Sequence, residues 1–112
     1  MRIAIPVEND SLCLHFGHCA NFVIVDLDEP NKKVLSKEVL EPPPHEPGLL
    51  PRWLSEKGVN KVIAGGMGAR AIDLFKQSHV EVIVGVRPAS VDAIIADYLS
   101  GCLTSGSNVC DH

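Results

Sequence analysis

The densest group of side chains able to bind a metal lies between Cys13 and Cys19, where two cysteines and the histidines His15 and His18 fall within seven positions. Thiolate and imidazole are the groups that zinc, copper and iron–sulfur species prefer as ligands. Gly17 lets the backbone bend so that neighbouring side chains can converge. The spacing is not that of a zinc finger, which needs a second ligand pair at a defined distance. We therefore predict a ligand-binding loop; the alternative is small buried cysteines and histidines that merely line a loop.

His45 is a further candidate ligand, in a segment of unusual composition. Residues 41–48 read EPPPHEPG, with four prolines in eight positions. Prolines fix φ and remove backbone donors, so the segment is predicted to be an extended, stiff loop. A histidine held on such a loop loses little entropy when it binds a ligand. The alternative is that the prolines only end a strand and that His45 is solvated.

A glycine-rich turn offers a place for an anion. Gly65, Gly66, Met67 and Gly68 lie between an expected strand and an expected helix, and Arg70 follows them. The N–H groups at a helix N-terminus favour an anion, glycine lets that anion approach closely, and arginine adds a forked, charged donor. The turn matches part of a dinucleotide fingerprint, but no acidic residue ends the next strand and no Walker-type Gly-Lys pair follows. The pattern leaves two possibilities, a general anion site or a simple tight turn.

Other polar residues give weaker indications. Cys102, Cys110 and His112 fall in the last eleven residues, which are rich in Gly and Ser and lack periodicity. Such a tail is typically mobile, although its Cys-x-His ending could close over a metal. His79 stands alone in a predicted helix-to-strand turn and is expected to be structural. No arrangement of nucleophile, base and acid stands out, so we expect a protein that is not an enzyme.

The elements that must position these residues can be read from hydrophobic periodicity. Alternation predicts strands and spacings of three and four predict helices, with Gly58 ending the first helix. The strands are expected at 2–7, 21–28, 33–40, 61–64 and 80–86, and the helices at 50–57, 69–77 and 90–99. The second and third strands would form a hairpin, and the later strand–helix alternation implies parallel pairing. The expected fold is α/β, a mixed sheet of about five strands with flanking helices, in one domain over 1–101 with a tail at 102–112.

Composition narrows the class of protein. The formal net charge is −4 and basic residues are not clustered, which argues against a nucleic-acid partner. The apolar run at the N-terminus is too short for a signal peptide or a membrane span. We therefore expect a cytoplasmic protein with no membrane partner. In that compartment the four cysteines should be reduced thiols or metal ligands rather than disulfides.

Together the motifs resemble the dinitrogenase iron–molybdenum cofactor biosynthesis family, the NifX-like domains, over roughly residues 1–101. The resemblance rests on the run HFGHC at 15–19 with Phe22 after it, on the Pro-rich segment that carries His45, and on IAGGMG at 63–68 followed by Arg70 and Ala71. It implies a ribonuclease-H-like α/β fold, in agreement with the pattern derived above. Cys13 and the Cys-x-His ending are not part of the family pattern.

For function, the resemblance implies non-catalytic binding or carriage of a metal–sulfur cluster or cofactor precursor. The cluster would be iron–sulfur, iron–molybdenum or a related species, handled together with cofactor-assembly proteins. The glycine turn from Gly65 to Gly68 and Arg70 would stabilise the negative charge of the cluster. The metal ligands would come from His15, His18, Cys19, His45 and, outside the family pattern, Cys13. Two alternatives stay open: a regulatory module that binds a small anion or nucleotide at Gly65–Arg70, and a simple zinc or copper protein or metal-dependent enzyme.

Overall fold

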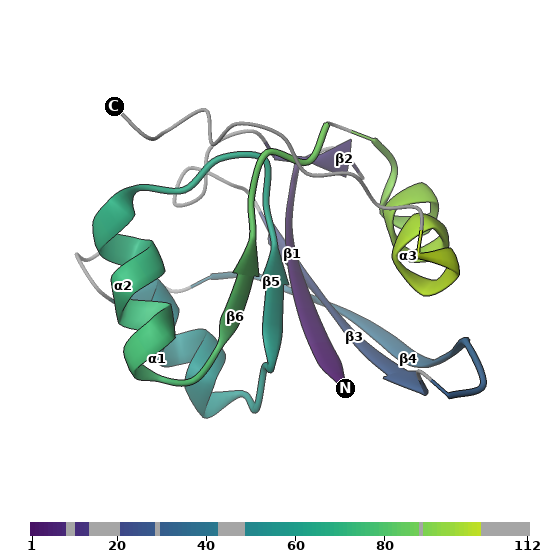
Figure 1. The fold of residues 1–112 in the computed structure, drawn as a ribbon, viewed down its shortest axis with the longest axis horizontal. Coiled ribbons are helices and arrows are strands. Elements are labelled where there is room, and N and C mark those ends of the chain that lie inside the picture. Colours follow the sequence, from purple (N-terminus) through teal and green to yellow (C-terminus); the bar gives the residue numbers. More distant parts are fainter. Residues whose placement is uncertain (9–10, 14–20, 29, 43–48, 88, 102–112) are drawn as a thin grey trace.

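A mixed six-stranded sheet stands between two layers of helices in the computed structural model, which describes residues 1–8, 11–13, 21–28, 30–42, 49–87 and 89–101 (Figure 1). The strands are β1 (Arg2–Glu8), β2 (Ser11–Leu12), β3 (Asn21–Asp28), β4 (Lys33–Leu40), β5 (Lys61–Ile63) and β6 (Glu81–Ile83). The helices are α1 (Leu49–Glu56), α2 (Ala69–Gln77) and α3 (Val91–Ser100). The main order is β4-β3-β1-β5-β6, and β2 pairs with β1. The predicted α/β fold with a mixed sheet is confirmed.

Strand direction divides the sheet at β1. The pairs β1–β3 and β3–β4 are antiparallel, whereas β1–β5 and β5–β6 are parallel. The predicted hairpin of the second and third strands is therefore present, as is the parallel pairing after it. None of the described helices is long and apolar enough to cross a membrane. The predicted tail at 102–112 lies outside the described residues.

Each face of the sheet carries its own hydrophobic core. On β1, Ile3, Ile5 and Val7 pack into a cluster with α3, whereas Ala4 packs into a cluster with α1 and α2. Figure 1 shows α1 and α2 on one side of the sheet and α3 on the other. Successive strand residues point to opposite faces, so both faces of a central strand must be apolar when both are covered. This explains the near-continuous apolar runs of β1 and β3.

Two strands differ from the sequence prediction by more than one residue at an end. The last strand ends at Ile83 rather than Val86, because Gly85 adopts a φ of 75° and turns the chain out of the regular ladder. The backbone N–H of Gly85 then donates to the carbonyl of Gly65 at 2.8 Å. The short strand β2 was not predicted, because two residues are too few to show an alternating hydrophobic pattern. Contacts distant in sequence stabilise it, such as the hydrogen bond from the N–H of Leu12 to the carbonyl of Ala89 at 2.9 Å.

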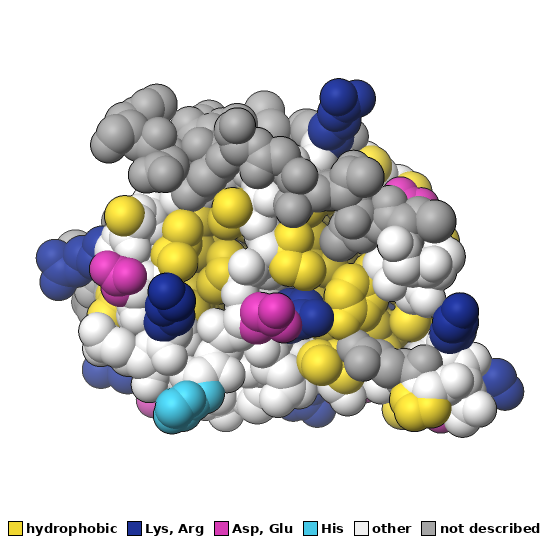
Figure 2. All heavy atoms as spheres, in the orientation of Figure 1, with side chains coloured by type: hydrophobic (Ala, Val, Ile, Leu, Met, Phe, Trp, Pro, Cys, Tyr) yellow, Lys and Arg dark blue, Asp and Glu magenta, His cyan; other side chains and the backbone are white. Residues whose placement is uncertain are grey.

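Lys61 on β5 connects α3 to the sheet through polar contacts. Its ammonium lies 2.8 Å from the hydroxyl of Tyr98 on α3, 3.1 Å from a carboxylate oxygen of Glu81, and 4.7 Å from the centre of the Tyr98 ring. Burial lowers the pKa of Lys61, but hydrogen bonds to Tyr98 and Glu81 outweigh that effect, and the pKa is raised. Figure 2 shows charged side chains between two groups of hydrophobic side chains, one toward α2 and one toward α3.

His79 strains the turn between α2 and β6. It has a φ of 61°, in the left-handed region that disfavours side chains with a Cβ. His79→Gly should therefore raise the free energy of unfolding by about 0.5–1 kcal/mol, as measured by urea denaturation. Gly58 ends α1 at a φ of 80°, so Gly58→Ala is the opposite control and should lower stability. Equal stabilities of the His79 variant and the parent would contradict this account.

A charged network at the amino end of β1 makes stability depend on pH. Arg2 Nε lies 2.8 Å from Asp26 Oδ1, Ser36 donates to Asp26 Oδ2 at 2.9 Å, and Arg2 Nη1 donates to the carbonyl of Lys57. The hydrogen bond from Arg2, followed by that from Ser36, holds the pKa of Asp26 below its ordinary value.

Because the folded pKa of Asp26 is depressed, its contribution is present above the unfolded pKa of about 3.9 and is lost as pH falls through the folded pKa. Asp26→Asn should be less stable than the parent near neutral pH, and this difference should shrink in acid. Urea denaturation of both proteins measures this difference, at pH values from about 2 to about 7 that span the titration of carboxylates. Ser36→Ala leaves the Arg2 bond intact and should show a smaller change of the same sign.

Candidate functional site

The carboxyl end of β1 contacts the described residues on both sides of the predicted Cys/His loop. On one side, the N–H of Cys13 donates to the carbonyl of Pro6 at 2.9 Å. On the other side, Asn21 opens β3 and pairs with Val7 of β1. Residues 14–20 lie outside the described residues. The two described residues that flank them therefore both lie at this end of the sheet.

The Pro-rich segment begins at the same end of the sheet. Leu40, the last residue of β4, pairs with Phe22 of β3, one residue from the start of that strand. Beyond the segment, α1 packs Trp53 edge-on against Phe22, with ring centres 5.8 Å apart and an interplanar angle of 68°. Residues 43–48, including His45, lie outside the described residues. The elements on either side of this segment, β4 and α1, thus both contact β3, the strand that follows the Cys/His loop.

The glycine-rich turn lies at the same end of the sheet, because β5 runs parallel to β1 and the turn follows its carboxyl end. Gly65 and Gly66 are buried, and the carbonyl of Gly65 accepts the N–H of Gly85 at 2.8 Å. Met67 is fully buried in the same cluster as Phe22 and Leu50. Of the predicted anion-binding residues, Met67 therefore serves as a core anchor, and its side chain is not available to a ligand. Gly68 and Arg70 are exposed.

Among the described residues, no side chain blocks or caps the N-terminus of α2. Gly68 is the N-cap residue, no side chain caps the helix, and the first turn carries no acidic residue. The first N–H groups of a helix have no partner within it, so they can donate to an anion. Gly68 has a φ of −65°, which any residue can adopt, and a Cβ built there meets nothing within 4 Å. Neither the backbone nor the described neighbours require glycine at this position.

Arg87 is a candidate that the sequence prediction missed. It follows Gly85 and Val86, whose N–H groups donate to the carbonyls of Gly65 and Ala64. This exposed guanidinium therefore follows a segment hydrogen-bonded to the glycine turn. In the sequence, Arg87 showed only that no acidic residue of a dinucleotide fingerprint ends this strand. Its position after β6, whose carboxyl end lies next to that of β5, could have indicated that it belongs to the site.

The predicted metal ligands are described only at Cys13. This residue is 7% exposed and is disulfide-bonded, with its partner outside the described residues. The expectation of a reduced thiol is therefore wrong for Cys13, because a sulfur in a disulfide is not a thiolate ligand. His15, His18, Cys19 and His45, like Cys102, Cys110 and His112 of the tail, lie outside the described residues. Within the described residues, no three His, Cys, Asp or Glu side chains form a group that could hold a metal ion.

Comparison with known proteins identifies the family. A family model described as dinitrogenase iron-molybdenum cofactor matches residues 1–101. The chain belongs to this family. That match covers every described element of the sheet and its helices.

Individual relatives cover nearly the whole chain. An uncharacterized protein of Methanocaldococcus jannaschii is 33% identical over 108 residues, which cover 92% of this chain and 89% of that protein. The crystal structure of PH0822 is 34% identical with a TM-score of 0.87 and covers 94% of both chains. The apo form of the orange protein from Desulfovibrio gigas has a TM-score of 0.74 at 20% identity, covering 96% of this chain and 93% of that one. At that identity the orange protein supports the fold alone.

The open N-terminus of α2 makes a testable prediction about Gly68. Gly68→Ser supplies a hydroxyl that can accept an N–H of the first turn, and it fits the observed φ. It should raise the free energy of unfolding by about 0.5 kcal/mol, measured by urea denaturation. Gly101, which ends α3 at a φ of 78°, is the matched control, and Gly101→Ser should destabilise. A loss of stability in Gly68→Ser would show that glycine is needed there for the fold itself.

Proposed function

We propose that this protein binds and carries a metal–sulfur cluster, or a precursor of such a cofactor, without acting as an enzyme. The observation that carries the proposal is that described residues next to all three motif segments lie at one end of the sheet. Cys13 and Asn21 flank the first segment, Leu40 precedes the second, and Gly65 begins the third. The family to which the chain belongs is described by an iron–molybdenum cofactor, which agrees with this assignment.

The charges at this edge suit an anionic cluster. The uncapped N-terminus of α2 offers N–H donors, and Arg70 and Arg87 supply guanidinium groups on two neighbouring segments. A guanidinium donates several hydrogen bonds in a fixed plane, so it can contact bridging sulfides or oxo groups without coordinating a metal. A Cβ at Gly68 would meet no atom of the described residues within 4 Å. These groups would hold the cluster through its charge.

The donor types proposed as metal ligands suit carriage. His15, His18, Cys19 and His45 provide imidazole and thiolate, which bind iron, copper and zinc. Three of the four are histidines, whose imidazole binds as a neutral ligand and competes with protons near neutral pH. Such a set binds a cluster less firmly than four thiolates and favours its transfer to an acceptor protein. Cys13 would join the set only after a dithiol donates two electrons and two protons to its disulfide, leaving two thiols.

A second function uses the same turn. The open N-terminus of α2 and Arg70 would also suit a phosphate or a nucleotide in a regulatory module. Arg87 argues against binding of a dinucleotide, because it lies near the end of the next strand, where the dinucleotide fingerprint has an acidic residue. The two functions differ in their need for His and Cys side chains, and this difference separates them experimentally. The cytoplasmic location and the cofactor-assembly partners stay predictions.

The test is anaerobic reconstitution of the reduced apo-protein with ferrous iron and sulfide, and separately with tetrathiomolybdate. A visible chromophore that stays with the protein through gel filtration is the expected result. The triple variant His18→Ala, Cys19→Ala, His45→Ala should lose it. Arg70→Ala should weaken retention about tenfold, or about 1.4 kcal/mol. His79→Ala is the matched control, since His79 is exposed beyond α2 at the opposite end of β6, and it should retain the chromophore.

Two results would overturn the proposal. One is a chromophore that persists in the triple variant. The other is protein purified with one zinc at unit stoichiometry and no uptake of either cluster species, which would favour a simple zinc protein. Calorimetry with inorganic phosphate and ATP tests the alternative function. Binding that is lost in Arg70→Ala but kept in the triple variant would establish it.

A further inference from the structure

The exposed aliphatic side chains of the described residues concentrate on one strand. Val34, Leu35 and Val39 of β4 are 46%, 66% and 60% exposed, and the only other large exposed hydrophobic residue of the described chain is Met1. All positions of β4 except the last are exposed. In the described sheet β4 is the end strand, with β3 as its only neighbour. An exposed, aliphatic edge strand of this length is a template for pairing with another strand.

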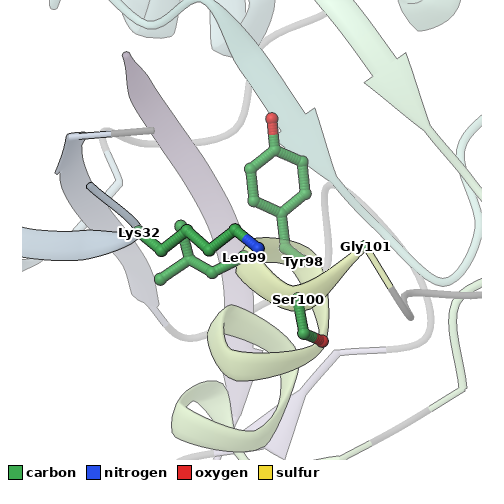
Figure 3. Close-up of a pocket in the computed structure, with 5 residues that line it drawn as sticks. All are labelled: Lys32, Tyr98, Leu99, Ser100 and Gly101. Atoms are coloured by element: carbon green, nitrogen blue, oxygen red, sulfur yellow. The ribbon is translucent and has the colours of Figure 1, made fainter. Parts of the chain in front are cut away.

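Helix α3 contacts β4 through the Lys37–Asp92 ion pair but draws no β4 side chain into its described core. No residue of β4 belongs to the described core cluster beneath α3. One hollow of about 330 Å³ separates the start of α3 from β4 and is lined by Lys37, Ser90, Val91 and Asp92. A second hollow of about 400 Å³ lies at the end of α3, and Figure 3 shows Lys32 reaching from the hairpin toward Leu99 and Gly101 there. The outer part of the hairpin is therefore open both along its edge and on its face toward α3.

We propose that two copies of this chain pair through β4, antiparallel, with Val39 facing the Val39 of the second copy. In an antiparallel pair the residues directly opposite lie on the same face. In this register Lys37 stands opposite Glu41 of the second copy, and two-fold symmetry gives that pair twice. Lys37 lies on the face toward α3, as its 3.1 Å ion pair with Asp92 shows. The period of two places Val39 on that face as well. Glu41 follows directly after β4, and the proposed pairing would extend the strand by this one residue, which would put Glu41 on the same face.

The other registers are less favourable. Centring the pair on Lys37 or on Glu38 sets like charges against each other. Centring it on Ser36 sets Leu35 against Lys37 and Val34 against Glu38. The register centred on Lys37 also pairs Leu35 with Val39 and Lys33 with Glu41, but it opposes the two Lys37 side chains. Only the register centred on Val39 joins an aliphatic pair to two pairs of opposite charge without setting like charges against each other. The strand thus specifies both its partner, a second copy, and the alignment.

The opposite edge of the sheet is a weaker candidate. β6 has three residues, and short edge strands resist pairing. Its Val82 and Ile83 are only partly exposed and already pack against the two cores. In the β4 pairing, by contrast, Glu41 lies in the interface, so the dimer would form beside the segment that leads to His45.

The experiment measures mass in solution. Sedimentation velocity over a range of protein concentrations should show a monomer–dimer equilibrium for the parent chain. Val39→Asp places two carboxylates across the axis and should give a monomer at every concentration. Leu35→Asp adds the same charge at an equally exposed position beyond the paired segment 37–41, and should remain dimeric. Circular dichroism checks that both variants fold.

Charge exchange tests the register. Glu41→Lys alone sets two lysines across each pair and should weaken the dimer at least tenfold, whereas Lys37→Glu combined with Glu41→Lys should restore it. Asp92→Ala removes only the intrachain ion pair and should leave the dimer in place. A parent chain that is monomeric at all concentrations overturns the proposal, as does a dimer that persists in Val39→Asp. Failure of the exchange to restore a dimer lost in Glu41→Lys overturns the register.

Discussion

The rest of the structure depends on the burial of both faces of β1. This strand lies at the centre of the sheet, and its alternate residues enter two separate cores. A shift of one residue would move Ile3 and Ile5 out of the core under α3 and Ala4 out of the other. Both shifts would place side chains of the wrong size against packed neighbours, so the register of β1 is strongly determined. The strands on either side inherit that register.

A fixed β1 also fixes the candidate site. Pro6 has no N–H, and it lies beyond the last β1–β5 pair, Ala4 with Val62, where the ladder no longer needs that donor. Its carbonyl instead holds Cys13. Asn21 pairs with Val7, so the described residues on both sides of the Cys/His segment are bonded to one strand. Anchoring of this kind reduces the entropy lost when a loop binds a ligand.

Local patterns predicted most of the fold, and contacts distant in sequence account for what they missed. The boundaries of α2 were predicted as the structure has them, because its apolar spacing lies between Gly68 and the turn at Ser78. The strand β2 exists only through β1 and Ala89, which no local pattern reveals. The residue types of the site could be recognised in the sequence. The burial of Met67, the disulfide at Cys13 and the position of Arg87 could not, since each depends on what the fold brings alongside.

The net charge limits how this site could act. The formal charge of −4 repels an anionic cluster. This repulsion is weak beyond the Debye length, because salt screens the field within about 10 Å. Closer in, the N-terminus of α2 and the two arginines oppose the overall charge. Attraction of this local kind would act equally on phosphate or sulfate. If the protein carries a cluster as proposed, discrimination would come from imidazole and thiolate, which bind a metal and have no such affinity for an oxyanion. Under the proposed function the two halves of the candidate site would have different tasks: the glycine turn would accommodate charge, and the His and Cys segments would select the metal.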